Sequence, residues 1–238
     1  MLVLRAGARR PFVLHDNGFY GAFGAAAARA LRRLGTRPAG VAHWNVGRPR
    51  PAALARRVRA ARADGLVLCG LVDTGAGAML RAARAVLPPG APVVACDGLL
   101  PASVAFRKAG PAAAGVLVTR GGLSADRLPP AGRAFARRLG RDTDVTAAYA
   151  AAATEALLAA IAASDGTRAS VAAHLRATRR AQSPIGPYAL DAVGDPRPAP
   201  VSVFRLERPG ALLAEDRVRP ARALEPISPP PRLWTTVP

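Results

Sequence analysis

The sequence predicts an α/β protein built on a doubly wound parallel sheet. Short apolar runs at residues 12–14, 66–69, 92–96 and 115–119 have the length of strands that are covered on both faces. Segments with helical hydrophobic periodicity separate these runs, and turn-forming residues follow most of them. Strands that alternate with helices form parallel sheets with right-handed crossovers. Such sheets bind ligands at the carboxyl ends of their strands, so the polar residues there are the first candidates for a site.

The first strand and helix occupy residues 11–35. Residues 12–14 form the apolar strand, and the polar residues at 15–18 form the turn. The helix that follows should pack on the sheet through Phe23, Ala27, Ala30, Leu31 and Leu34. Its opposite face carries Arg29, Arg32 and Arg33. Gly35 ends the helix, and Tyr20 lies where a ligand would be met.

The next segments continue the alternation. Residues 39–42 make a weak strand, followed by a loop with His43, Trp44 and Asn45. Pro51 suits the first turn of a helix, where the N–H that it lacks is not needed. This helix has an inner face of Leu54, Val58 and Ala61, and Asp64-Gly65 ends it.

A glycine-rich loop, GLVDTGAG at residues 70–77, follows the strand at 66–69. It leads into a helix whose inner face consists of Met79, Leu80, Ala83 and Val86. The strand at 92–96 ends on Asp97-Gly98. The loop has neither the GxGxxG pattern nor the Gly-Lys-Ser/Thr pattern of phosphate-binding loops, so its glycines indicate a close approach to a small ligand or a neighbouring strand.

The pattern changes after residue 119. A Gly- and Pro-rich loop runs to Pro130, and a helix marked by Phe135 and Leu139 follows. An Ala-rich helix should span about 144–164, with capping residues at Asp142, Thr143 and Asp144. We expect a third helix at 170–179 and a hairpin at 187–206 that turns at Val193-Gly194-Asp195. The segment from Pro209 has many prolines and no periodicity.

The formal net charge of +19 comes almost entirely from arginine, since Lys108 is the only lysine. The arginines are spread along the outer faces of helices and form no stripe, which predicts weak, salt-sensitive binding to polyanions and no specific nucleic-acid partner. No apolar run reaches the roughly 20 residues of a membrane span. The first ten residues, MLVLRAGARR, lack the apolar segment of a signal peptide.

Catalytic and metal-binding patterns are weak in this sequence. His15 lies beside Asp16 without a nucleophile placed to use them, and His43 and His174 have no partners in the pattern. Cys69 and Cys96 each end a buried strand without metal-ligand spacing. Two inert thiols are expected, and a disulfide requires neighbouring strands and an oxidising compartment. We expect no enzyme, no metal and no cofactor.

The remaining candidates lie at strand ends: Tyr20, the Asp73-Thr74 loop and Asp97. Their shared place at the carboxyl edge of one sheet favours ligand binding over separate structural roles.

The ordered segments VLHDNGFYG, GAGAMLRAAR, VVACDGLLPASV, AAAGVLVT and IGPYALDAVGDP resemble the type I periplasmic binding proteins of the leucine/isoleucine/valine-binding kind. The resemblance implies two α/β lobes that close on a ligand by hinge motion. It implies that Tyr20 lines the cleft and that Asp97 pairs with the ligand's α-ammonium group. Val72, Asp73 and Thr74 match a cleft loop that often holds an aromatic residue, and Tyr149-Ala150-Ala151 stands where Tyr-Asp-Ala is usual.

The resemblance also implies a domain organisation. Residues 1–120 should form the second lobe, 121–186 the helical part of the first lobe, 187–208 a returning hairpin and hinge, and 209–238 a Pro-rich tail. Relatives carry a first-lobe sheet before this segment, with Ser and Thr donors for the ligand carboxylate. We therefore expect a fragment, a shortened gene product or the downstream part of a longer chain, with apolar helix faces left uncovered.

The implied function is the substrate-binding component of an ABC transporter for amino acids. Its partners would be a small amino-acid-like ligand and the membrane permease subunits, in the periplasm or at the cell surface. An intracellular small-molecule sensor with the same fold is the alternative, and the absence of a signal peptide favours it. An enzyme on the same sheet and a nucleic-acid-binding module rank below both.

Overall fold

A parallel sheet forms the centre of the larger part of the structure. Its five parallel strands lie in the order β5-β4-β3-β1-β2, and β9 and β10 extend it beyond β5. These strands are β1 (Pro11–Asp16), β2 (Gly40–Trp44), β3 (Gly65–Cys69), β4 (Val93–Cys96), β5 (Leu117–Gly121), β9 (Val201–Arg205) and β10 (Arg219–Pro220). β10 pairs antiparallel with β9. The predicted doubly wound parallel sheet is confirmed.

The computed structural model describes residues 2–140, 145–207 and 219–220. These residues divide into two compact units. The first contains residues 2–120, 203–207 and 219–220, and the second contains residues 121–140 and 145–202. The predicted tail from Pro209 lies outside the described residues, apart from the backbone of β10.

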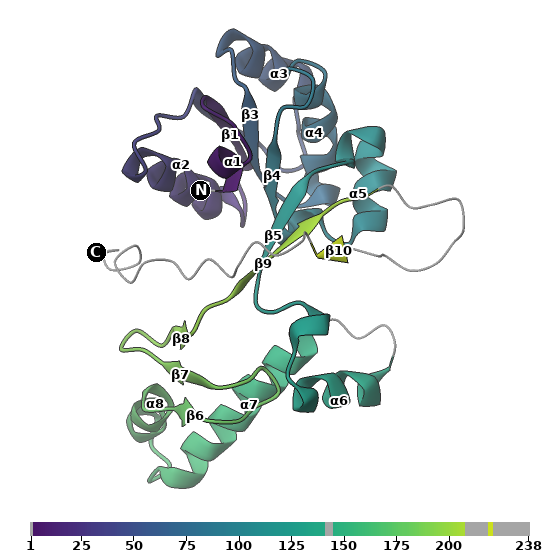
Figure 1. Ribbon diagram of the computed structural model, residues 1–238. Helices are drawn as coiled ribbons and strands as arrows, with labels where there is room; N and C mark the ends of the chain where they lie inside the picture. Colours follow the sequence, from purple (N-terminus) through teal and green to yellow (C-terminus); the bar gives the residue numbers. More distant parts are fainter. Residues whose placement is uncertain (1, 141–144, 208–218, 221–238) are drawn as a thin grey trace. The chain divides into compact units, whose positions relative to one another are not determined.

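Helices cover both faces of the sheet in the first unit (Figure 1). One face carries α1 (Leu2–Arg5) and α2 (Gly21–Arg33), and the other carries α3 (Pro51–Ala60), α4 (Ala76–Arg84) and α5 (Ala102–Ala109). Side chains alternate along each strand between the two cores, so Val13 packs with α1 and α2 while Leu14 packs with the other three helices. Single-turn 3-10 helices lie at η1 (Val72–Thr74), η2 (Asp97–Leu99), η3 (Gly110–Ala113) and η4 (Ala125–Arg127).

Helix α2 faces the sheet with only part of its predicted inner face, since Leu31 is buried as expected. Phe23 and Leu34 are 48% and 42% exposed, whereas Gly24, Ala28 and Leu31 are buried. A Cβ on Gly24 would lie 2.4 Å from the His15 ring, so only glycine lets the helix approach β1 this closely. Hydrophobic periodicity alone favours the larger side chains as the inner face, and that prediction is wrong for Phe23 and Leu34 and also for Ala30, which is exposed.

The second unit consists of three helices and a small antiparallel sheet. The helices are α6 (Pro130–Leu139), α7 (Thr146–Ala163) and α8 (Arg168–Arg176), and the sheet contains β6 (Arg179–Arg180), β7 (Tyr188–Leu190) and β8 (Pro196–Arg197). Helix α7 buries an alanine at every fourth position, which are Ala148, Ala152, Ala156 and Ala160. The expected caps at Asp142, Thr143 and Asp144 lie outside the described residues.

Apolar side chains of α7 remain uncovered in the described structure. Leu157, Leu158 and Ile161 are 43%, 60% and 48% exposed. The expectation that no apolar segment is long enough for a membrane span does not hold for α7, because its 18 residues, with a mean hydropathy of 1.4, could cross a membrane by length and composition alone. Only 22% of this segment is buried, so the apolar helix surface that the sequence leads us to expect is present.

The predicted hairpin at 187–206 is only partly correct. Strands β7 and β8 form its two arms, and the Asp191 carboxylate holds the turn by accepting the N–H groups of Val193 and Asp195. The chain then leaves the hairpin, and β9 joins the seven-stranded sheet. Leu206 explains this path, because its side chain is buried in the first unit and its backbone bonds to Val116.

Candidate functional site

The carboxyl ends of four parallel strands lie at one edge of the sheet in the first unit. In register, Asp16 at the end of β1 pairs with Trp44 at the end of β2, and His15 pairs with Cys69 at the end of β3. Strand β4 ends at Cys96, directly before Asp97. This is the edge at which open α/β sheets bind ligands.

Tyr20 and Asp97 meet at this edge. The Tyr20 hydroxyl donates a hydrogen bond of 2.9 Å to Asp97 Oδ1, across 77 residues of sequence. Tyr20 is buried and Asp97 is half-buried. Burial raises the pKa of Tyr20 well above its usual value, and the hydrogen bond and negative charge of Asp97 raise it further. The Tyr20 phenol therefore keeps its proton and remains a hydrogen-bond donor that orients the Asp97 carboxylate. The carboxylate oxygens can accept further hydrogen bonds.

Asp16 positions Tyr20 at the start of α2. Its carboxylate is 2% exposed and accepts the backbone N–H groups of Gly18 and Tyr20 at 3.0 and 3.1 Å. An aspartate that bonds to backbone N–H groups two and four residues later fixes a tight turn between a strand and a helix. The polar turn thus carries Tyr20 to the strand ends, and its own aspartate is structural.

The polar groups of the loop after β3 bond to partners other than Tyr20 and Asp97. Val72 is buried, and the Thr74 hydroxyl bonds to the carbonyl oxygen of Leu71. The Thr74 carbonyl oxygen accepts a 3.1 Å hydrogen bond from the Trp44 indole. Asp73 forms a 3.6 Å ion pair with Lys108 at the surface. The described structure thus brings Tyr20 and Asp97 into contact, and the ligand roles of Val72, Asp73 and Thr74 stay predictions.

Two phenylalanines extend the site as an aromatic surface. The ring of Phe19 lies 5.1 Å from that of Tyr20 and 5.7 Å from that of Phe23, and Tyr20 and Phe23 are 5.4 Å apart. Phe19 is 75% exposed. The hydrophobic pattern assigns Phe23 to the core and does not single out Phe19. The available signal is their spacing around Tyr20, since residues at i and i+4 share one side of a helix start.

Two histidine rings also lie at this edge, His15 at the end of β1 and His43 in β2. Within residues 2–140 and 145–207 no three His, Cys, Asp or Glu side chains gather as a metal site would need. The His15 ring stacks on that of His43 at 5.9 Å, and its Nδ1 lies 2.6 Å from the Asp16 carbonyl oxygen. Taken together, the Tyr20–Asp97 pair and the rings of Phe19 and Phe23 suit the recognition of a ligand with a polar group beside an apolar one.

The sequence matches the profile of a known family over residues 2–211, described as "Periplasmic binding protein". The chain belongs to the periplasmic binding protein family. This confirms the resemblance inferred from its ordered segments. No curated protein matches the sequence of this family member.

Solved structures of periplasmic binding proteins share its fold. A leucine-binding protein from Thermotoga maritima is 21% identical with a TM-score of 0.70. The match covers 86% of this chain and 61% of the Thermotoga protein, and the coverages below are given in the same order. A putative branched-chain amino acid ABC transporter protein from Rhodospirillum rubrum is 20% identical with a TM-score of 0.68, at 87% and 60% coverage. A solute-binding protein from R. palustris in complex with 4-hydroxybenzoate is 14% identical with a TM-score of 0.67, at 87% and 59% coverage. This periplasmic binding protein spans about 60% of the length of these structures.

Proposed function

We propose that this chain is part of the substrate-binding component of an ABC transporter and that it binds a small ligand with an ammonium group, such as an amino acid. The observation that carries the proposal is the 2.9 Å hydrogen bond between Tyr20 and Asp97 at the carboxyl edge of the sheet. The family and the shared fold support a binding role in place of catalysis.

The chemistry of the pair favours a cationic group. An ammonium ion that leaves water needs a fixed negative charge and hydrogen-bond acceptors. Asp97 supplies both, and Tyr20 holds one of its oxygens in place. A ligand that carries only a carboxylate, such as the 4-hydroxybenzoate in the R. palustris structure, would instead meet the like charge of Asp97.

The aromatic surface supports a ligand that also has an apolar part. Phe19 exposes three quarters of its surface directly beside Tyr20. Covering such a ring with an aliphatic or aromatic group removes apolar surface from water, which is favourable by roughly 25 cal/mol per Å². Val72, Asp73 and Thr74 are proposed as further contacts from the loop after β3, on the resemblance alone.

The domain assignment is part of the same proposal. Residues 1–120 would form the second lobe, residues 121–186 the helical part of the first, and residues 187–208 the returning segment. The division of the described residues between Arg120 and Gly121 supports the first boundary. The proposal also includes closure of the lobes on the ligand, docking on membrane permease subunits and a periplasmic or surface location, and the family match supports these parts.

The test is isothermal titration calorimetry on the full native chain, with a panel of amino acids and with benzoate. We expect an amino acid to bind, and Asp97→Asn to weaken this binding at least about tenfold, because the lost charge leaves the ammonium group unpaired. Asp126→Asn, an exposed carboxylate in the second unit, is the matched control and should not change affinity. Equal affinity of the Asp97→Asn variant, or preferential binding of benzoate, would contradict the proposal.

A further inference from the structure

Two cysteines face each other at the ligand edge of the sheet. Cys69 ends β3 and Cys96 ends β4, and these strands are parallel neighbours with Leu68 opposite Ala95. The Cys96 thiol donates a hydrogen bond to the Cys69 sulfur, with the two Sγ atoms 3.0 Å apart. The sequence pattern predicts two inert thiols and allows a disulfide only if the strands are neighbours and the compartment is oxidising, and the structure meets the first of these conditions.

We propose that Cys69 and Cys96 form a reversible intramolecular disulfide that links the two loops at this edge. Neighbouring strands lie about 4.8 Å apart, and a disulfide accepts Cα separations of about 4.4–6.8 Å. The sulfur atoms need to move only about 1 Å closer to reach the bonding distance of about 2.05 Å. Side-chain rotation can supply such a movement without a change in strand pairing.

The reaction needs a disulfide as oxidant, and glutathione disulfide represents this class. The thiolate of the half-buried Cys96 attacks one sulfur of the oxidant and releases one molecule of glutathione. Cys69 then attacks Cys96 Sγ, and the second glutathione leaves with the Cys69 proton. Two thiols lose two electrons and two protons in total, and one glutathione disulfide becomes two glutathiones.

The surroundings of the two thiols explain why Cys96 reacts first and Cys69 second. Contact with Cys96 and burial raise the pKa of Cys69, so its thiolate is scarce until the mixed disulfide has formed beside it. Cys69 is also 1% exposed, which shields it from a bulky oxidant. Cys96 is the accessible sulfur, and Cys69 is the resolving one.

The bond would act on both loops that carry predicted ligand residues. Cys69 directly precedes the loop 70–77, with Val72, Asp73 and Thr74, and Cys96 directly precedes Asp97. A covalent link at their bases would hold these loops in one arrangement. This inference depends on the position of the thiols alone, so it stands or falls separately from the proposed ligand.

The test equilibrates the full native chain with mixtures of reduced and oxidised glutathione, followed by acid quenching, alkylation under denaturing conditions and peptide mass spectrometry. We expect a cross-linked peptide pair containing Cys69 and Cys96, with the mass of two hydrogens lost and no glutathione retained. We also expect the oxidised chain to melt about 5–10 °C above the reduced chain, because the link closes a loop between residues 69 and 96. Both changes should reverse with dithiothreitol.

Two variants separate the proposal from other outcomes. Cys69→Ala should leave Cys96 as a stable mixed disulfide with glutathione, and the double variant Cys69→Ala/Cys96→Ala should show no redox-dependent melting shift. Free alkylation of both cysteines in the native chain under oxidising conditions would overturn the proposal. The proposal would also be overturned if the chain without substitutions kept glutathione on Cys96, or if it formed disulfides between molecules.

Discussion

Gly98 lies so close to the backbone of Gly70 that a side chain does not fit at position 98. A Cβ on Gly98 would be 2.5 Å from the carbonyl oxygen of Gly70 and 3.0 Å from Tyr20 Cε2. The close approach brings together the loops that follow β3 and β4, and Asp97, next to Gly98, accepts the hydrogen bond of the Tyr20 hydroxyl. Glycine at position 98 is therefore a condition for the geometry of the candidate site.

Gly98→Ala should destabilise the chain because the new methyl group meets backbone that cannot rotate away. We expect a loss of about 1–3 kcal/mol in the free energy of unfolding, as for other overpacked sites. Urea denaturation followed by circular dichroism measures it. Gly121→Ala is the control, since a Cβ there meets nothing within 4 Å. Equal stability of the two variants would show that the loops do not approach as described.

Tyr20→Phe should remove the bond to Asp97 and cost about 1 kcal/mol of stability at neutral pH. The raised pKa of Tyr20 adds a signature at alkaline pH. The folded chain keeps the phenolic proton above pH ~10, where the unfolded chain loses it, so the wild-type stability falls as pH rises through this range. The Tyr20→Phe variant should lack this part of the slope. If the free energy of unfolding changed with pH by the same amount in both chains from pH 8 to 11, the result would contradict the raised pKa of Tyr20.

Asp16→Ala should weaken the turn that places Tyr20. The substitution leaves the N–H groups of Gly18 and Tyr20 without their acceptor, at an expected cost of about 1–2 kcal/mol. Asp16→Asn keeps one oxygen and should lose less. Thermal unfolding of the three chains gives the order, and an asparagine variant as unstable as the alanine variant would point to the charge in place of the hydrogen bonds.

Lys108→Ala should change stability by less than about 0.5 kcal/mol. Its ion pair with Asp73 is 3.6 Å long, and the side chains of Lys108 and Asp73 are 49% and 68% exposed, so water and salt weaken it. Denaturant unfolding at low and high salt checks this. A salt-dependent loss above about 1 kcal/mol would mean that the loop after β3 depends on this pair.

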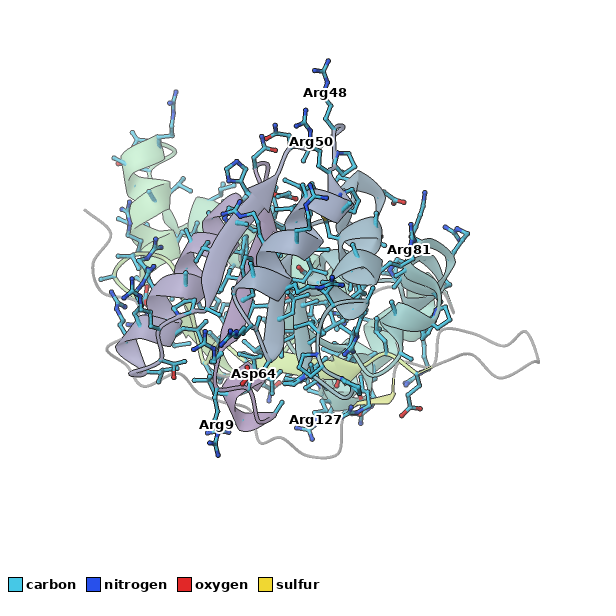
Figure 2. The ribbon with its side chains drawn as sticks, turned by 90° about the horizontal axis from the view of Figure 1, so that it is seen from above. Arg9, Arg48, Arg50, Asp64, Arg81 and Arg127 are labelled. Atoms are coloured by element: carbon cyan, nitrogen blue, oxygen red, sulfur yellow. The ribbon has the colours of Figure 1, made fainter. Side chains whose placement is uncertain are left out.

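The arginine excess should produce only non-specific binding to polyanions. Arg48 and Arg50 project together at the top of the view in Figure 2, whereas Arg9 projects at the bottom and Arg81 lies to the right, which matches a spread of charge over several sides of the first unit. We expect duplex DNA of any sequence to bind the +19 chain weakly, with affinity falling about tenfold or more between 50 and 200 mM salt. Fluorescence anisotropy with two unrelated duplexes measures it, and a clear preference for one would contradict the expectation.

Local patterns were enough to locate most strands and helices. The apolar run at 66–69 became β3, and the strand ends carry Tyr20 and Asp97 where the periodicity places them. Trp44 is a clear failure, because the pattern puts it in a loop and the structure buries it at the end of β2. Its indole packs where Gly70 leaves space and donates to Thr74, contacts made between distant segments.

The sequence by itself determined the alternation of strands and helices, and with it the edge at which the polar residues gather. These features follow from hydrophobic periodicity and turn chemistry, which act over a few neighbouring residues. Only the tertiary structure decided that Tyr20 bonds to Asp97, that Cys69 faces Cys96 and that Phe23 turns outward beside Phe19. Each of these depends on strand order and on how closely α2 approaches β1 at Gly24, which are set by packing between segments far apart in the chain.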